Sequence, residues 1–399
     1  MYSSISSGDS LTSSTPSTAA TSLLASYDEQ DQIFSSAFSI LDAALSAHAF
    51  PAASAAITHR GRLIALKAFG RFTYESDPMG ARMVSAATLF DLASLTKVVA
   101  TTTVAMLLYE RGILELEVPV SGVIPEFLRG AVTSSCDPRR NEVTFRKLLA
   151  HSSGLPAYEK LFLKHATRDE LLQAAFTTPL TADPGTHAEY SDIGFVILGA
   201  ALERLAGESL DQFCQREIFG PLGMTNTTFN PPAELRAQIP PTAKECGADA
   251  RSNFRNRIIQ GEVQDENASV LGGIAGHAGL FSTAGNVARF AHAMLNGGRP
   301  ILRPETVALF TRREAEPAST SRTLGWDTPS APSQSGKYFG PASFGHLGYT
   351  GTSLWIDPDR QLSIALLTNR TWPDCSNQAI KQVRPQFHDA VMDALNRSL

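Results

Sequence analysis

The chain has 399 residues, of which 43% are apolar and 18% charged, so it holds enough apolar material for a buried core and is long enough for two or three lobes. Its formal net charge of −5 gives no basic surface for nucleic acid, and we expect none to bind. The longest apolar run, 98–108, is shorter than the ~18 residues of a membrane span and contains threonines, so no transmembrane helix is expected.

The N-terminal segment, 1–26, is rich in serine and threonine but lacks the basic start and the apolar stretch of a secretory signal. We predict that it is a disordered tail and that the protein is cytoplasmic. The cysteines form no CxxC pair, so we expect unreactive thiols rather than a zinc or redox centre; they are Cys136, Cys214, Cys246 and Cys375.

Both ends of the chain carry strand and helix patterns. Apolar residues at helical spacing predict a helix within 31–50, and two apolar runs around the turn 59–62 predict a hairpin over 52–72. Two alternating strands are predicted within 351–370, and the last segment, 376–399, has a helical pattern that a proline should kink or break. We expect one sheet built from both ends of the chain.

The long middle of the chain is different. Most of its segments carry the 3.6-residue period of helices; they are 168–177, 192–206, 209–218 and 284–296. We therefore predict an α/β (α+β) fold in which a mostly helical lobe, 116–335, is inserted into a sheet lobe formed by 27–115 and 336–399. A cleft between two such lobes is a common ligand site.

Ser94 and Lys97 stand near the start of a long helical pattern, 91–112, and are the only serine and lysine three residues apart in that order. One interpretation makes Ser94 a helix cap and Lys97 a surface charge. Alternatively, the two share a helix face and Lys97 accepts the proton of a nucleophilic Ser94. A lysine base starts from a pKa of about 10.4, so burial would have to lower it by ~3–5 units. The apolar residues on both sides of the pair predict such burial.

Tyr190 and Asp192 lie at the start of a second amphipathic helix, within 188–207. One interpretation makes Tyr190 a packing residue that staples the helix start and Asp192 a helix cap or first-turn acid. Alternatively, Tyr190 is a phenolic acid/base directed at Ser94, with the acid beside it. A third element, 344–358, is a glycine-rich entry into a strand. It indicates either close strand packing, or an edge where a main-chain N–H completes an oxyanion hole.

Together the three elements resemble the SxxK, Tyr-x-Asn and Lys-Thr-Gly motifs of the serine β-lactamase and penicillin-binding-protein superfamily. In this chain they are Ser94/Lys97, Tyr190-Ser191-Asp192 and His346-Leu347-Gly348. The sequence is most similar to the class C β-lactamase-like group of esterases, D-amino-acid peptidases and transesterases, from about residue 30 to the C-terminus. GxSxG, HExxH, the P-loop and GxGxxG are absent, which removes the usual support for other hydrolases and for nucleotide enzymes.

The resemblance implies a β-lactamase-like fold, an antiparallel sheet flanked by helices, with the catalytic cleft between the lobes. It also implies that Ser94 forms an acyl-enzyme while Lys97 and Tyr190 move its proton. The oxyanion would lie between the backbone N–H groups of Ser94 and Tyr349, and neither metal nor cofactor is needed. Substrate contacts are expected from Asp192, His346, Gly348 and His277.

Two positions depart from the β-lactamase pattern and bear on the substrate. His346 replaces a lysine that meets the β-lactam carboxylate, and a mostly neutral histidine loses a charge-assisted bond worth ~1.5–3 kcal/mol. Asp192 replaces an asparagine, so it only accepts hydrogen bonds. Alternatively, Asp192 pairs with Lys97 and keeps that lysine charged, which shifts the role of base to Tyr190. We therefore favour hydrolysis of short-acyl or aryl esters.

Other functions stay open. Weak lactam or amide activity is compatible with the motifs, and the alternatives are a β-lactamase or a D-stereospecific peptidase, against which the missing export signal argues. A non-catalytic penicillin-recognising or scaffold protein is a further alternative, although the joint presence of the serine, lysine and tyrosine speaks against it. The expected partner is a small-molecule ester, lactam or amide. The natural substrate and the oligomeric state are not indicated.

Overall fold

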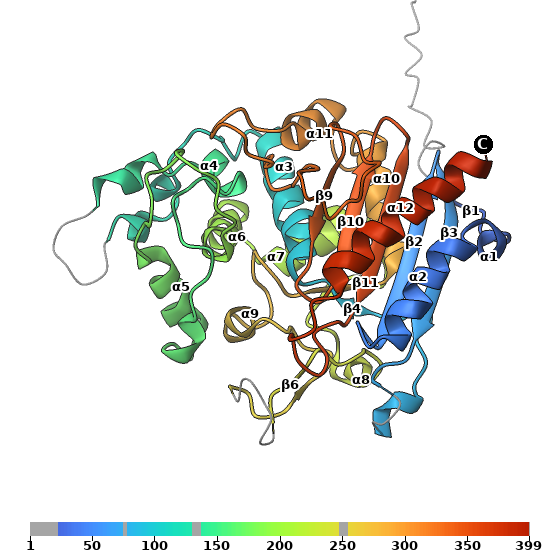
Figure 1. Cartoon of the computed structure of the whole chain (residues 1–399). Coiled ribbons are helices and arrows are strands. Elements are labelled where there is room, and N and C mark those ends of the chain that lie inside the picture. Colours follow the sequence, from blue (N-terminus) through green and yellow to red (C-terminus); the bar gives the residue numbers. More distant parts are fainter. Residues whose placement is uncertain (1–22, 75–77, 130–136, 247–253, 399) are drawn as a thin grey trace, which may run out of the picture.

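The computed structural model describes residues 23–74, 78–129, 137–246 and 254–398. Its main sheet has six strands in the order β1-β3-β2-β11-β10-β9 (Figure 1). All neighbouring strands are antiparallel except β1 and β3, which are parallel. Because β11 pairs with β2, the two ends of the chain form one sheet, as predicted. The strands are β1 Leu24–Ala25, β2 Ala52–His59, β3 Arg62–Gly70, β9 Phe344–Leu347, β10 Ser353–Asp357 and β11 Leu362–Thr368.

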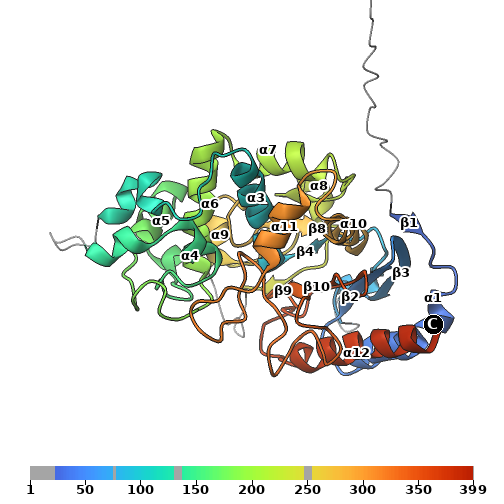
Figure 2. The same ribbon diagram turned by 90° about the horizontal axis from the view of Figure 1, so that it is seen from above.

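Helices cover both faces of this sheet (Figure 2). Helices α2 and α12 lie side by side on one face, and α10 lies on the other; they span Ser35–Ser46, Ile380–Ser398 and Ala284–Leu295, respectively. Strand residues alternate between the two faces. In β11, Ile364 and Leu366 join the apolar cluster under α2 and α12, whereas Ala365 and Leu367 join the cluster on the α10 side. Both faces of the sheet are therefore buried.

Several of the remaining helices pack around α6. This helix runs over Asp192–Ala206, is buried from Ile193 to Leu202, and contacts α3, α4, α5 and α7. The mixed α/β fold class predicted from the sequence is confirmed. The other α-helices are α1 Gln30–Ile33, α3 Thr103–Glu110, α4 Phe145–Leu149, α5 Arg168–Thr177, α7 Leu210–Cys214, α8 Ala233–Arg236, α9 Glu266–Val270 and α11 Pro304–Thr311. Short strands form two small sheets, one of β4 Phe90–Asp91, β8 Leu280–Ser282 and β5 Thr228–Phe229, the other of β6 Ala243–Lys244 and β7 Ile258–Ile259.

Two elements differ from the expectations. Leu24–Ala25, inside the predicted tail, form β1 against β3, while residues 1–22 lie outside the described part. Pro385 does not break α12. A proline lacks the N–H that would bond the carbonyl four residues earlier. That carbonyl, on Lys381, instead accepts a hydrogen bond from Gln334 Nε2 at 3.0 Å.

Helix α10 packs on the sheet although it falls within 116–335, the predicted helical lobe. The division into lobes therefore stays a prediction. None of the described helices is long and apolar enough to cross a membrane. Cys214, Cys246 and Cys375 are free thiols, and Cys136 lies outside the described residues.

Candidate active site

Ser94 lies in a single 3-10 turn, Ala93–Leu95, shortly after strand β4. The Asp91 side chain accepts a hydrogen bond from the Ala93 N–H at 2.8 Å and fixes the start of the turn. Ala93 adopts a φ of 46°, which is uncommon for a residue with a side chain. The turn has no side-chain cap, so the interpretation of Ser94 as a helix cap is wrong. Its side chain lines a cleft of about 1030 Å³.

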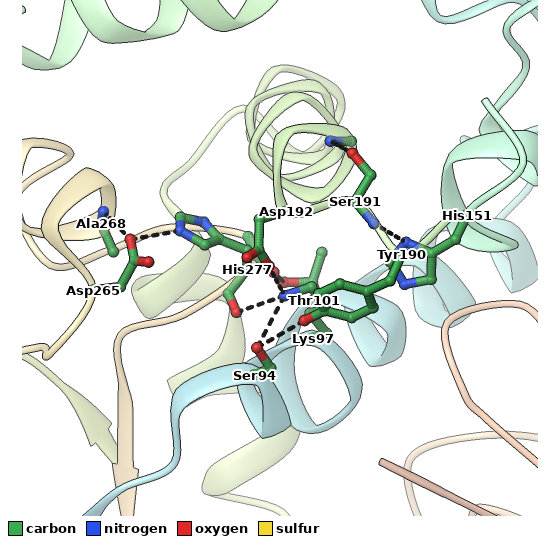
Figure 3. Close-up of polar contacts among 12 residues, drawn as sticks. Ser94, Lys97, Thr101, His151, Tyr190, Ser191, Asp192, Asp265, Ala268 and His277 are labelled. Carbon is green, nitrogen blue, oxygen red and sulfur yellow. Dashed lines mark hydrogen bonds and ion pairs between the residues drawn. The ribbon is translucent and has the colours of Figure 1, made fainter. Parts of the chain in front are cut away.

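Lys97 begins a π-helical segment, Lys97–Thr102, that leads into α3, and its side chain is fully buried. Three acceptors surround the ammonium nitrogen: Asp192 Oδ1 at 2.6 Å, the His277 carbonyl at 3.1 Å and Ser94 Oγ at 3.2 Å (Figure 3). They match the three N–H groups of a charged lysine. The burial predicted from the apolar flanks is confirmed, and the interpretation of Lys97 as a surface charge is wrong.

The Tyr190 phenol donates a hydrogen bond to Ser94 Oγ at 2.8 Å. Tyr190 precedes Ser191, the N-cap of α6, and Asp192 is an acid in the first turn of that helix rather than its cap. His151 supports this tyrosine: their ring centroids lie 4.7 Å apart, and His151 Nδ1 accepts a hydrogen bond from the Ser191 N–H at 3.0 Å (Figure 3). No pattern in the sequence marked His151 for this position.

The charges of the site favour a protonated Lys97 and a neutral Tyr190. Burial alone would lower the pKa of Lys97, but the Asp192 carboxylate and the Tyr190 phenol outweigh it and raise that pKa above its usual value. Burial and the Asp192 carboxylate raise the pKa of Tyr190 to about 12, against the opposing effect of the Lys97 ammonium. Asp192 therefore pairs with Lys97, which is one of the two alternatives that the sequence left open.

His277 holds Lys97 through its backbone, while its ring makes a separate contact. Its Nε2 lies 2.9 Å from Asp265 Oδ1, and its carbonyl accepts a hydrogen bond from Lys97 Nζ (Figure 3). The turn before it packs directly on α6, because a Cβ on Gly276 would overlap the Phe195 carbonyl. His277 also lines the cleft, and its contact with substrate stays a prediction.

Strand β9 brings the third sequence element to the cleft. His346 is 2% exposed, and its Nδ1 donates a hydrogen bond to the Leu347 carbonyl at 2.8 Å. Burial, together with the nearby cations Lys97 and Arg322, holds the pKa of His346 well below its usual range. The ring is therefore neutral, as its reference pKa suggested from the sequence.

Gly348 and Tyr349 run close to the turn that carries Ser94. A Cβ on Gly348 would lie 2.6 Å from the Leu92 carbonyl, so no larger residue fits there. Within the described part of the chain, the backbone N–H groups of Ser94 and Tyr349 donate to no backbone carbonyl. An oxyanion hole requires two such N–H donors, and the assignment of Ser94 and Tyr349 to one stays a prediction.

The cleft wall also contains residues that the sequence did not mark. The guanidinium carbon of Arg322 lies 5.5 Å from the centre of the Tyr190 ring, and Arg322 pairs with Asp327 at 3.4 Å. Tyr158 and Phe254 add apolar surface. Arg322 and Asp327 lie in the loop between α11 and β9, whereas Tyr158 and Phe254 come from two other segments. Among the residues that the structure describes, no cluster of His, Cys, Asp and Glu is arranged to hold a metal ion.

Similarity to known proteins identifies the family. A family model described as Beta-lactamase matches residues 37–384. The chain belongs to this family. Two curated relatives of this β-lactamase-family protein are each 32% identical to it over 347 residues. One is the "Putative D-alanyl-D-alanine carboxypeptidase" of Escherichia coli (strain K12), with 80% of this chain and 79% of the relative covered. The other is the "N-acetylmuramyl-L-alanine amidase" of Bacillus subtilis (strain 168), with 80% and 77% covered.

Solved structures share the fold of the β-lactamase-family protein. "EstCE1, a hydrolase with promiscuous acyltransferase activity" matches with a TM-score of 0.73 at 22% identity, over 91% of this chain and 99% of that one. A class C beta lactamase matches with a TM-score of 0.70 at 16% identity, also over 91% and 99%. At these identities the likeness concerns the fold alone. The β-lactamase-like fold that the sequence resemblance implied is confirmed.

Proposed function

We propose that this β-lactamase-family protein is a serine hydrolase that cleaves carboxylic esters through an acyl-enzyme on Ser94. The observation that carries the proposal is the contact of Ser94 Oγ with the Tyr190 phenol at 2.8 Å and the Lys97 ammonium at 3.2 Å, beside a large cleft. A hydroxyl flanked by two proton-handling groups and open to a ligand cavity has the arrangement of an activated nucleophile.

In the first half-reaction, Ser94 Oγ attacks the ester carbonyl carbon while its proton passes to the Tyr190 oxygen. Tyr190 must first release its own proton to solvent through the open cleft, which costs about 7 kcal/mol at pH 7 for a pKa of about 12. Lys97 stays protonated, because burial lowers its pKa less than Asp192 and Tyr190 raise it. Its positive charge favours the phenolate form of Tyr190.

The carbonyl oxygen becomes an oxyanion between the backbone N–H groups of Ser94 and Tyr349. When the tetrahedral intermediate collapses, the bond to the alcohol breaks and the alcohol takes the proton from Tyr190. Water then attacks the acyl-enzyme and gives a proton to Tyr190. Tyr190 returns that proton to Ser94 Oγ as the carboxylic acid leaves.

Two features favour a neutral, apolar ester over a β-lactam. The neutral His346 offers no charge to a β-lactam carboxylate, and the Arg322 cation already pairs with Asp327. Tyr158 and Phe254 are 36% and 38% exposed where they line the cleft. Their apolar surface suits an aryl or short alkyl group that leaves water on binding.

A second candidate function is hydrolysis of an amide or peptide bond of the cell-wall type. The names of the two curated relatives favour it, since one is named "Putative D-alanyl-D-alanine carboxypeptidase" and the other "N-acetylmuramyl-L-alanine amidase". The same acyl-enzyme steps serve an amide, with an amine as the leaving group. The expected cytoplasmic location is compatible with ester hydrolysis, the first candidate, whereas an enzyme that acts on the cell wall must be exported.

Four substrates separate these candidates: p-nitrophenyl acetate, p-nitrophenyl butyrate, nitrocefin and a D-alanyl-D-alanine peptide. We expect fast release of p-nitrophenol with slow turnover of the other two. Faster peptide cleavage would replace the first candidate by the second, and faster nitrocefin cleavage would assign a β-lactamase.

Ser94→Ala should abolish turnover, whereas the exposed Ser46→Ala should not. Mass spectrometry should find the acyl group on the tryptic peptide that contains Ser94. If Ser94→Ala still turned over substrate, the nucleophile would have to be reassigned. If the wild type neither turned over a substrate nor formed an adduct, the protein would be a non-catalytic member of its family.

A further inference from the structure

Arg384, in the first turns of α12, lies beneath the turn that follows β9. It is 5% exposed and donates hydrogen bonds from its guanidinium to three backbone carbonyls of that turn: Gly348 and Thr352, each at 3.0 Å, and Gly351 at 3.3 Å. Arg384 pairs with no carboxylate among the described residues. Burial and the neighbouring Arg370 lower the pKa of Arg384 to about 9. Burying a guanidinium that has no carboxylate partner costs desolvation free energy, which suggests that its charge has a role other than stabilising the fold.

The Gly348 carbonyl belongs to the same peptide group as the Tyr349 N–H. A charged donor on the carbonyl draws electron density toward the oxygen and makes the N–H of that group a stronger donor. The Tyr349 N–H is one of the two unused N–H groups beside Ser94. Arg384 therefore binds the carbonyl end of the peptide group whose N–H end belongs to Tyr349, a residue that lines the same cleft as Ser94.

The same turn is also tied to the segment that leads into Ser94. Thr350 Oγ1 donates to the Asp91 carbonyl at 2.8 Å, and Thr352 Oγ1 donates to the Leu92 carbonyl at 2.9 Å. Arg384 closes the turn from the other side through its three carbonyl contacts. The spacing between the Tyr349 N–H and Ser94 is thus set by bonds on both sides of the turn.

We propose that Arg384 is a positioning residue that orients and polarises the Gly348–Tyr349 peptide group as half of the oxyanion hole. The inference rests on the proposed function, because it needs an oxyanion to form at Ser94. Arg384 touches no reacting atom. Its charge lies behind the peptide group, where it stabilises the transition state more than the bound substrate.

Three variants test this proposal in the full-length protein with p-nitrophenyl acetate. Arg384→Met removes charge and donors, Arg384→Gln keeps a neutral donor, and Arg384→Lys keeps a charged donor. We expect Arg384→Met to lower kcat by about 10- to 100-fold with KM changed by less than about threefold. Arg384→Lys should recover more activity than Arg384→Gln. Arg360→Met, at a partly exposed arginine paired with Asp357, is the matched control and should keep wild-type activity.

A boronic acid gives a readout that a merely structural role would not move, because it forms a tetrahedral anionic adduct with a catalytic serine. Its inhibition constant should rise in each variant in proportion to the fall in kcat/KM. Thermal melts identify variants that do not fold. If Arg384→Met does not fold, the activities of Arg384→Lys and Arg384→Gln are compared to test whether the charge of residue 384 supports catalysis. Equal activity of these two variants, or unchanged boronate affinity in a folded variant of lowered kcat, would overturn the proposal. Absence of activity and adduct in the wild type would instead overturn the proposed function.

Discussion

The ammonium of Lys97 and the carboxylate of Asp192 lie 2.6 Å apart, with the lysine side chain fully buried and the acid 19% exposed. In the motif that this part of the sequence resembles, an asparagine stands in place of Asp192. The acid adds a negative charge beside the lysine and stabilises its protonated form. Lys97 is therefore better suited to electrostatic support than to accepting a proton, which leaves the proton transfer of the proposed reaction to Tyr190.

Replacing Asp192 with asparagine should make the site active at lower pH. The carboxylate is the main group that raises the pKa of Lys97 against burial, and after burial it is the main group that raises the pKa of Tyr190. Both pKa values should fall in Asp192→Asn, so the rising limb of kcat/KM against pH should move toward neutral by about one unit or more. The exposed Asp42→Asn is the matched control. If the rising limb of kcat/KM against pH did not move, Asp192 would not be the group that raises the pKa values of Lys97 and Tyr190.

Wild-type activity should rise with pH and show no plateau near pH 6.5. Burial raises the pKa of Tyr190 to about 12, so the phenolate fraction grows about tenfold per pH unit over the neutral and mildly alkaline range. Burial also holds the pKa values of His151 and His346 well below their usual range. Neither ring should therefore change its charge near pH 6.5 or alter the pH dependence of activity there. Ester hydrolysis across pH, with a thermal melt at each point, checks this. A midpoint near 6.5 would make a histidine the base.

Placing a lysine at His346 should increase β-lactam turnover. We expect kcat/KM for nitrocefin to rise about tenfold in His346→Lys, while that for p-nitrophenyl acetate stays within about threefold. The new amine would lie near Lys97 and Arg322, which disfavour its charge, so the gain should be larger at lower pH. His165→Lys, outside the cleft, is the control. No gain would remove the argument that this position disfavours β-lactams.

Gly276→Ala should disturb both stability and activity. Its Cβ would overlap the Phe195 carbonyl and lie 2.9 Å from Gly199 Cα, and neither backbone group moves cheaply. We expect a loss of about 1–3 kcal/mol in the free energy of unfolding. The neighbouring His277 carbonyl would shift away from Lys97, so kcat should fall as well. Denaturant titration and ester assays measure both effects.

Gly285→Ala is the matched control for this substitution. A Cβ at Gly285, in α10, would approach its nearest neighbour at an ordinary 3.7 Å. This variant should keep the stability and activity of the wild type. Wild-type behaviour of Gly276→Ala as well would contradict the close packing of its turn on α6.

Local patterns in the sequence were sufficient for much of the fold. The hairpin of β2 and β3, the strands β10 and β11, and the helices α2, α5, α6 and α10 lie within or close to their predicted ranges. Periods of two and 3.6 residues arise from neighbouring residues, so they are readable without a structure. Motif spacing also marked Ser94, Lys97 and Tyr190, which the fold brings into contact. The break that was one of the two expectations for Pro385 does not occur, and the bond that compensates for the missing N–H comes from Gln334, far away in the sequence.

The sequence by itself determined the elements, the family resemblance and the candidate trio. Only the tertiary structure decided the charge of the trio and what holds it: Asp192 against Lys97, His151 beside Tyr190, and Arg384 beneath the turn after β9. The reason is physical. A pKa depends on burial and on every charge nearby, and both are sums over segments that are distant in the chain. The sequence left two roles open for Asp192, and the 2.6 Å contact with a buried lysine decided between them.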